Sequence, residues 1–114
     1  MIIKKPAIFI YTHHPDVSVL KEVCAGIEEE GLFYEIKELP DECMEKLAYK
    51  AARDSMPGVG IGVFKTAICL KMQGLEKGRN IESYRIPTQR QCRIVGSNSA
   101  RAVKKLPFKE EASF

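Results

Sequence analysis

The order of apolar patterns along residues 7–64 constrains the fold of this chain more than any other feature. Residues 7–11 (AIFIY) form a short β-branched and aromatic run, which is typical of a strand buried on both faces. Residues 33–37 (FYEIK) alternate apolar and polar side chains, and residues 59–64 (VGIGVF) return to a buried strand pattern. The segments between these three runs have apolar residues at helical spacing. This order favours parallel strands joined by helical crossovers, so we predict an α/β fold with a mostly parallel sheet and flanking helices.

The two helices between these strands are predicted from periodicity. The first has a buried stripe at i, i+3, i+4 and i+7 and ends at Gly31 as a left-handed cap. Its stripe residues are Leu20, Val23, Cys24 and Ile27. The second opens at Pro40 and Asp41 and stops before Pro57. Its stripe residues are Met44, Leu47, Ala48 and Ala51.

The second half of the chain gives weaker signals. Ile68 and Leu70 alternate with smaller or polar residues, and a turn rich in Gly and Lys covers residues 74–80. Residues 81–86 read as extended. A last helix is predicted to begin near Ser97 or Asn98, which are both good N-cap residues, and to stop at Pro107.

Length and composition agree with one domain. The chain has 114 residues, of which 45% are hydrophobic and 29% charged, enough for one compact core and no second one. We expect a single α/β domain over residues 1–108 and a frayed tail over residues 109–114. The longest apolar run near the start is far shorter than the roughly 20 residues that cross a bilayer, so we expect no membrane span and no membrane partner. Cysteines at positions 24, 43, 69 and 92 form no C-x-x-C pair and are predicted to be reduced, mostly packed thiols of a cytoplasmic protein.

The two halves of the chain differ in charge. Residues 1–57 hold seven Lys/Arg and eleven Asp/Glu, whereas residues 58–114 hold eleven Lys/Arg and four Asp/Glu. A basic half can meet phosphates or an acidic protein surface, so a small nucleic-acid or phosphate-binding module is one hypothesis. It would use Arg85, Arg90, Arg93, Arg101, Lys104 and Lys105. Because no aromatic stacking platform accompanies these cations, we favour a protein partner over nucleic acid.

Two other motifs suggest sites and have simpler structural interpretations. The run 58–62 (GVGIG) resembles a nucleotide loop, but it is itself strand-like and lacks the spacing of a dinucleotide fingerprint, so close backbone packing is favoured. His13, His14 and Asp16 follow the first strand, where α/β sheets often bind ligands. A turn in which Asp16 caps the helix is the favoured interpretation there.

Three consecutive glutamates, Glu28, Glu29 and Glu30, occupy the last turn of the first predicted helix. At the negative end of the helix dipole, each carboxylate destabilises the helix by about 0.3 to 1 kcal/mol unless a cation lies nearby. Steps of about 100° per residue place Glu29 opposite the buried stripe and its two neighbours on the flanks. Two interpretations follow from the residues: a solvated acidic face, or an interface in which one carboxylate completes a partner's Mg²⁺ site.

Three segments resemble the small (beta) subunit of the diol or glycerol dehydratase reactivase family. These segments are residues 26–31 (GIEEEG), residues 51–57 (AARDSMP) leading into the strand at 59–63, and residues 96–108 (GSNSARAVKKLPF). The resemblance implies a non-catalytic subunit with the fold of the medium (beta) subunit of coenzyme B12-dependent diol dehydratase. The turn at residues 12–16 and the Lys-rich stretch at residues 71–79 depart from the family pattern.

The same resemblance implies partners and a mechanism. The large subunit would be an actin- or Hsp70-like ATPase that binds ATP or ADP, in an α2β2 heterotetramer. The small subunit would leave it so that the large subunit can replace the medium subunit of the inactivated dehydratase, which releases damaged cobalamin. Glu29 matches the family glutamate that completes a Mg²⁺ site on the large subunit, with Glu28 and Glu30 in the interface. A structural medium subunit of a B12-dependent dehydratase is the alternative. The implied location is cytoplasmic, with association to a bacterial microcompartment left open.

Overall fold

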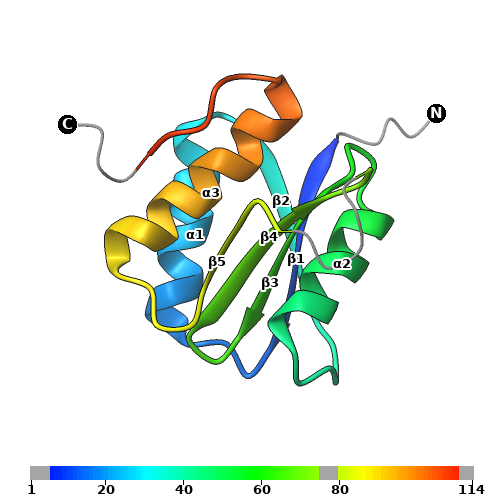
Figure 1. Cartoon of the computed structure of the whole chain (residues 1–114), viewed down its shortest axis with the longest axis vertical. Helices are drawn as coiled ribbons and strands as arrows, with labels where there is room; N and C mark the ends of the chain where they lie inside the picture. The colour runs from blue at the N-terminus through cyan, green and yellow to red at the C-terminus, as the bar shows by residue number, and fades with distance from the viewer. Residues whose placement is uncertain (1–5, 75–79, 111–114) are drawn as a thin grey trace.

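A computed structural model describes residues 6–74 and 80–110. Figure 1 shows the order of the elements along this part of the chain. The strands are β1 (Ala7–His13), β2 (Phe33–Glu38), β3 (Val59–Phe64), β4 (Ala67–Met72) and β5 (Glu82–Tyr84). The helices are α1 (Val17–Glu29), α2 (Met44–Asp54) and α3 (Gln89–Lys104). The predicted α/β class is confirmed.

The five strands form one sheet in the order β2-β1-β3-β4-β5. Strand β1 runs parallel to β2 and β3, whereas β4 is antiparallel to β3 and to β5. The expectation of a mostly parallel sheet is therefore wrong, because the sheet is mixed. Lys65 and Thr66 alone connect β3 to β4, and a two-residue connection can only join antiparallel strands.

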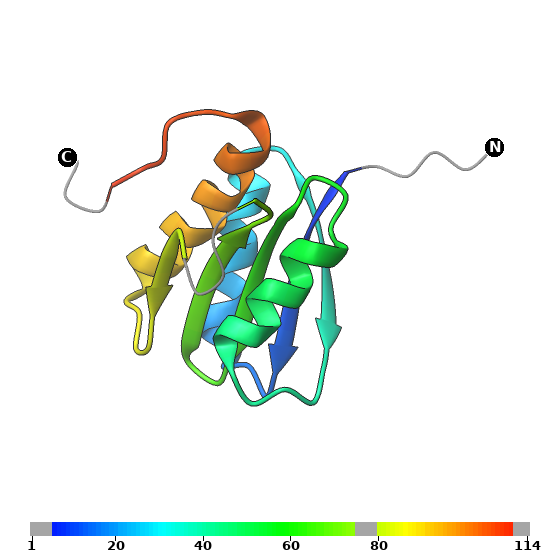
Figure 2. The ribbon, with the colours of Figure 1, turned by 45° about the vertical axis from the view of Figure 1, so that its right-hand side comes forward.

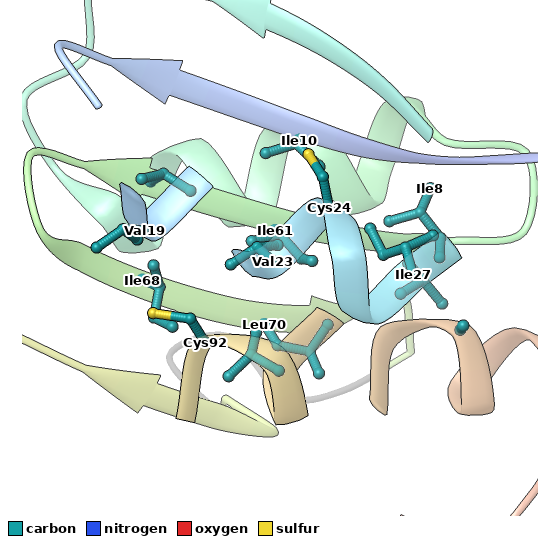
Figure 3. Packing of buried hydrophobic residues seen from close by; sticks show 14 of the residues in the cluster. Ile8, Ile10, Val19, Val23, Cys24, Ile27, Ile61, Ile68, Leu70 and Cys92 are labelled. Carbon is teal, nitrogen blue, oxygen red and sulfur yellow. The ribbon is translucent and has the colours of Figure 1, made fainter. Parts of the chain in front are cut away.

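Helices cover both faces of the sheet. Figures 1 and 2 show α1 and α3 side by side on one face and α2 on the other. The larger core lies under α1 and α3, where Ile8 and Ile10 of β1 meet Val23 and Ile27 of α1 (Figure 3). A smaller cluster beneath α2 contains Tyr11, Leu47 and Ala51.

Helix α1 follows its predicted pattern. Asp16 caps its start by accepting a hydrogen bond from the Val19 backbone N–H at 3.1 Å. Gly31 follows the last turn with φ +76°, the left-handed conformation predicted for it. Val23, Cys24 and Ile27 are buried as expected.

Helix α2 begins later than predicted. It starts at Met44, not at Pro40 and Asp41, and Cys43 at its N-cap makes no side-chain capping bond. Asp41 instead accepts a hydrogen bond from Lys50 Nζ at 2.8 Å, which holds the loop against the side of the helix. The predicted buried residues Leu47, Ala48 and Ala51 do face the core.

Helix α3 begins well before the predicted start near Ser97 or Asn98. Its N-cap is Thr88, which forms a capping box with Gln91, and the helix continues to Lys104. Ser97 and Asn98 lie in the middle of the helix and are buried. The prediction was wrong because these polar side chains bond to other parts of the fold instead of to the backbone of a helix start.

The expected tail is ordered at its beginning. The Lys109 backbone N–H donates to Asn98 Oδ1 at 2.6 Å, and Asn98 Nδ2 donates to the Lys109 carbonyl at 3.0 Å. Residues 111–114 of the predicted tail and residues 75–79 of the predicted turn lie outside the described residues.

Cys24, Cys69 and Cys92 are buried free thiols, which agrees with the packing role expected of them, and Cys43 is half-buried. Burial raises the pKa of Cys69 to about 12 and that of Cys92 to about 11. Among residues 6–74 and 80–110, no helix combines the length and apolar character that crossing a membrane requires.

Candidate partner-binding site

Two glycines allow α1 and α3 to cross at backbone contact. A methyl group added to Gly26 would lie 2.2 Å from the Arg93 carbonyl oxygen, and one added to Gly96 would lie 2.0 Å from the Val23 carbonyl oxygen. These separations are far below van der Waals contact, so a larger residue would force the helices apart. The crossing places the acidic last turn of α1 beside the basic residues of α3.

Glu30, at the C-cap of α1, is surrounded by polar groups of the chain's last segment. Its carboxylate accepts from Ser97 Oγ at 2.8 Å, Lys104 Nζ at 3.1 Å and Arg101 Nε at 3.4 Å. Lys109 Nζ lies 3.5 Å from the same carboxylate. Only 11% of the Glu30 side chain is exposed. Burial would raise the pKa of Glu30, but the bonds from Ser97 and Lys104 outweigh it and lower that pKa to about 2.

Glu29 has a looser arrangement. Its carboxylate pairs with the Arg93 guanidinium, while 45% of its side chain stays exposed. Arg93 has a second partner, because its Nη2 lies 2.8 Å from Glu22 Oε2. The Glu29 carboxylate can therefore turn to another cation without leaving Arg93 unpaired. The predicted outward direction of Glu29 agrees with this exposure.

Glu28 accepts a hydrogen bond from the Tyr34 hydroxyl of β2 at 2.9 Å. This bond and the partial burial of Tyr34 raise the pKa of that tyrosine well above its usual value of 10.0. Each of the three glutamates thus has a polar partner within the chain. We call these glutamates, together with Arg93, Arg101 and Lys104, the α1–α3 charged surface.

The α1–α3 charged surface explains how α1 tolerates three carboxylates in its last turn. That turn contains no basic residue of its own, and the cations come from α3. Lys104 Nζ also donates to the Glu30 carbonyl at 2.8 Å, which satisfies a backbone group at the helix end. The two interpretations made from the sequence, a solvated face or a partner's cation, did not include cations from another helix of the same chain.

The histidine turn has a structural role. His13 Nδ1 lies 2.7 Å from the Leu39 carbonyl and 3.1 Å from Glu38 Oε2, so it joins the end of β1 to the end of β2. Asp16 caps α1, as predicted. Within residues 6–74 and 80–110, no three His, Cys, Asp or Glu side chains gather in a way that could hold a metal ion.

The run 58–62 lies mainly in β3, and its glycines serve close packing. A methyl group at Gly60 would lie 2.1 Å from the Ala52 backbone nitrogen, and one at Gly62 would lie 2.1 Å from the Met44 carbonyl oxygen. Helix α2 can approach β3 because these positions have no side chain. The run does not open a helix, so it lacks the geometry of a dinucleotide loop.

Three of the six basic residues of the nucleic-acid hypothesis are paired with carboxylates of the same chain. Arg93, Arg101 and Lys104 pair with glutamates of α1. A phosphate would have to compete with these internal carboxylates for them. This arrangement favours a protein partner with charges of both signs and disfavours a polyanion such as a nucleic acid.

Comparison with known proteins identifies the family. Residues 5–109 match the family described as dehydratase medium subunit. The chain is 32% identical to the propanediol dehydratase-reactivating factor small subunit of Citrobacter freundii, over 92% of this chain and 91% of that protein. It is 31% identical to the protein of the same name from Salmonella typhimurium, with the same coverage of both chains. The chain belongs to the family of dehydratase-reactivating factor small subunits.

Solved structures place this small subunit in the same fold. It matches a chain of a diol dehydratase-reactivating factor complexed with ADP and Mg²⁺ with a TM-score of 0.86 and 29% identity, over 94% of this chain and 100% of the other. A glycerol dehydratase reactivase chain matches with a TM-score of 0.86 and 25% identity, over 92% of this chain and 97% of the other. The family predicted from the sequence is thereby confirmed.

In this small subunit, two of the segments that carried the resemblance meet in space. Residues 26–31 supply the glutamates and Gly26, and residues 96–108 supply Gly96, Ser97, Arg101 and Lys104. Sequence reasoning found the glutamates but missed Arg93 and Ser97 as their partners. The available signal was the Thr88 and Gln91 capping box, which would have extended α3 back across Arg93.

Within residues 6–74 and 80–110, the small subunit can offer Mg²⁺ a carboxylate but no complete site. Carboxylate oxygen suits Mg²⁺, and one or two protein carboxylates are a common contribution to its coordination. The half-exposed Glu29 fits such a contribution, whereas Glu30 is enclosed by cations.

Proposed function

We propose that this chain is the non-catalytic small subunit of a two-subunit reactivating factor that rescues an inactivated coenzyme B12-dependent diol or glycerol dehydratase. The observation that carries the proposal is the match over nearly the whole chain, in sequence and in fold, to small subunits of dehydratase-reactivating factors. The partner is a large subunit with an actin- or Hsp70-like ATPase domain, in an α2β2 heterotetramer in the cytoplasm.

The proposed mechanism is subunit exchange. The chain belongs to a family that is named after the medium subunit of the dehydratase itself, so one fold serves the reactivating factor and its target. Chains with one fold can present equivalent surfaces to a common partner. ATP and ADP bias the exchange only if the large subunit binds them with different affinity in its two complexes. Loss of the dehydratase medium subunit opens a path through which damaged cobalamin leaves.

Glu29 is proposed to complete a Mg²⁺ site on the large subunit. Its carboxylate is half-exposed, and its internal partner Arg93 keeps Glu22 when Glu29 turns away. Glu29 would hold the ion, which would supply positive charge to the contact. Glu28 and Glu30 border the contact, where Glu30 keeps the end of α1 fixed against α3.

The test is the affinity of the small subunit for the purified large subunit, measured by titration calorimetry with Mg²⁺ and with a chelator. Glu29→Gln should weaken the Mg²⁺-dependent complex by roughly tenfold or more, because it removes the negative charge that would face the positively charged ion. Glu45→Gln is the matched control, because it neutralises an exposed carboxylate on α2, on the other face of the sheet, and it should leave the affinity unchanged. Equal affinities for the original chain and Glu29→Gln in Mg²⁺ would remove Glu29 from the mechanism.

A second candidate function is a permanent medium subunit of a B12-dependent dehydratase, because the matching family carries that description. The two functions differ in the large protein bound. Affinity capture from the native cytoplasm should recover an ATPase whose retention changes between ATP and ADP. Recovery of a cobalamin enzyme alone, held equally with and without nucleotide, would support the medium-subunit function instead.

A further inference from the structure

Strand β2 is an open edge of the sheet. It stands at the end of the strand order, and Figure 2 shows it as the outermost strand on the side of β1. Its Phe33 and Ile36 side chains are 53% and 47% exposed, and they point to opposite faces of the sheet. Residues 33–38 contain no proline. Its three charged residues, Glu35, Lys37 and Glu38, restrict the edge to an added strand of complementary charge.

The register with β1 determines which backbone groups of β2 point outward. Glu38 pairs with Thr12, and the Leu39 N–H donates to the Thr12 carbonyl at 2.8 Å. Backbone groups of successive residues alternate in direction along a strand, so Phe33, Glu35 and Lys37 direct theirs toward β1, as Leu39 does. The other residues of the strand, Tyr34, Ile36 and Glu38, direct theirs away from the sheet.

We propose that the free small subunit forms a symmetric dimer in which β2 of two copies pair antiparallel about Ile36. This register matches the backbone, because Ile36 then faces Ile36 of the second copy as a hydrogen-bonded pair. Tyr34 and Glu38 face each other across the axis as further hydrogen-bonded pairs. A single sheet would run through both copies.

The side chains favour the same register. Glu35 lies directly opposite Lys37 of the second copy, and the symmetry repeats this pair. These two residues are non-hydrogen-bonded positions, where side chains come closest across an antiparallel pair. On the opposite face, Ile36 packs on its copy, whereas the Tyr34 hydroxyl and the Glu38 carboxylate keep their bonds within each chain, to Glu28 and Thr12 respectively. At each end, Phe33 lies opposite Leu39.

Neighbouring symmetric registers are less favourable. Centring the pair on Glu35 places that carboxylate opposite itself, and centring it on Lys37 does the same with an ammonium group. Centring it on Tyr34 or on Glu38 leaves Glu35 and Lys37 without opposite charges across the axis. In a register centred between two residues, each residue whose backbone groups point outward would lie opposite one whose groups point toward β1, so the two could not hydrogen-bond. The charge pattern therefore selects the register centred on Ile36.

The experiment measures the mass of the isolated, purified chain by sedimentation equilibrium. We expect a concentration-dependent dimer. Glu35→Lys and Lys37→Glu should each weaken it by roughly tenfold or more, because each turns two attractive cross-strand pairs into repulsive ones. Lys21→Glu, an exposed charge reversal on α1, is the control and should leave the dimer unchanged. Circular dichroism should show that each variant is folded.

Mixing provides the decisive measurement. A Glu35→Lys chain and a Lys37→Glu chain place opposite charges across both pairs, so an equimolar mixture should restore a dimer that neither forms alone. Native mass spectrometry distinguishes this heterodimer. A dimer insensitive to both reversals, or a mixture that stays monomeric, overturns the proposal. A monomeric original chain at every concentration also overturns it and leaves the edge to a strand of another protein. These measurements need no large subunit, so their failure would not bear on reactivation.

Discussion

A methyl group added to Gly96 would lie 3.2 Å from the Cα atom of Gly26, so these two glycines face each other where α3 crosses α1. The crossing brings Ser97 within 2.8 Å of Glu30 and Arg93 against Glu29. Helix packing in the core and the arrangement of charges on the surface therefore depend on the same small residues.

Gly96→Ala should destabilise the protein by about 1 to 3 kcal/mol, because the added methyl group would overlap the Val23 carbonyl oxygen. The sign of this effect is informative. In an exposed helix interior, alanine stabilises relative to glycine by about 1 kcal/mol. Urea unfolding measures the difference, with Lys21→Ala as a surface control that should change stability little. A stabilised Gly96→Ala protein would contradict the close crossing.

Glu30→Gln should lower the free energy of unfolding by about 2 kcal/mol near neutral pH, since hydrogen bonds to a charged group contribute about this much. The folded-state pKa of Glu30 is about 2, below its usual value of 4.5, so the carboxylate stabilises the fold fully above pH 4.5. That contribution is lost as pH falls from 4.5 toward 2. Urea unfolding of both proteins across this range should show the difference shrinking toward the acid end. A difference that does not depend on pH would rule out ionisation as its source.

Glu29→Gln should change the free energy of unfolding by less than about 0.5 kcal/mol, because a half-exposed ion pair contributes little to stability. Arg93 retains Glu22 at 2.8 Å in this variant. Unfolding of the Glu29 and Glu30 variants in the same buffer gives the comparison. A loss for Glu29→Gln as large as that for Glu30→Gln would mean that Glu29 is a structural residue and is not readily released to a partner.

The first half of the fold could be predicted from the sequence because its signals are local. Strand β3 was predicted with its observed bounds, and α1 from one apolar stripe and the left-handed Gly31. The direction of β4 was not predicted, because alternation of side chains is the same in parallel and antiparallel strands. The short connection at Lys65 and Thr66 carried that information.

The start of α3 could not be found from residue preferences alone. Ser97 and Asn98 are N-cap residues by preference, yet their side chains bond to Glu30 and Glu82, which lie far away in the sequence. Because the helix was predicted to start too late, Arg93 fell outside it. Glu29 is half-exposed, but it pairs with Arg93 of α3, and this internal cation depends on a long-range packing arrangement.

Thr88→Ala should destabilise the protein by about 1 kcal/mol, because it removes the hydroxyl that accepts from the Gln91 backbone N–H at 3.1 Å. Thr88→Ser keeps that hydroxyl and should retain most of the stability. Thermal unfolding followed by circular dichroism compares the two variants. Equal losses for alanine and serine would assign the effect to the lost methyl group instead of the cap.

Asn98 is the buried residue that joins β5, α3 and the C-terminal segment. Its Nδ2 donates to Glu82 Oε1 at 2.7 Å and to the Lys109 carbonyl at 3.0 Å, while its Oδ1 accepts from the Lys109 N–H at 2.6 Å. Asn98→Ala removes all three bonds and should cost about 2 kcal/mol, since the remaining partners must find water.

The same variant should release the segment around Lys109. Trypsin should then cleave after Lys109 much faster than in the original protein, because proteolysis requires a locally detached backbone. Mass spectrometry of the early products identifies the cut. Glu82→Gln is the matched control: it weakens one bond of Asn98 and keeps both bonds to Lys109, so it should leave the cleavage rate nearly unchanged. If Asn98→Ala is cleaved there no faster, the segment is held by contacts other than Asn98, such as the ion pair between Lys109 and Glu30.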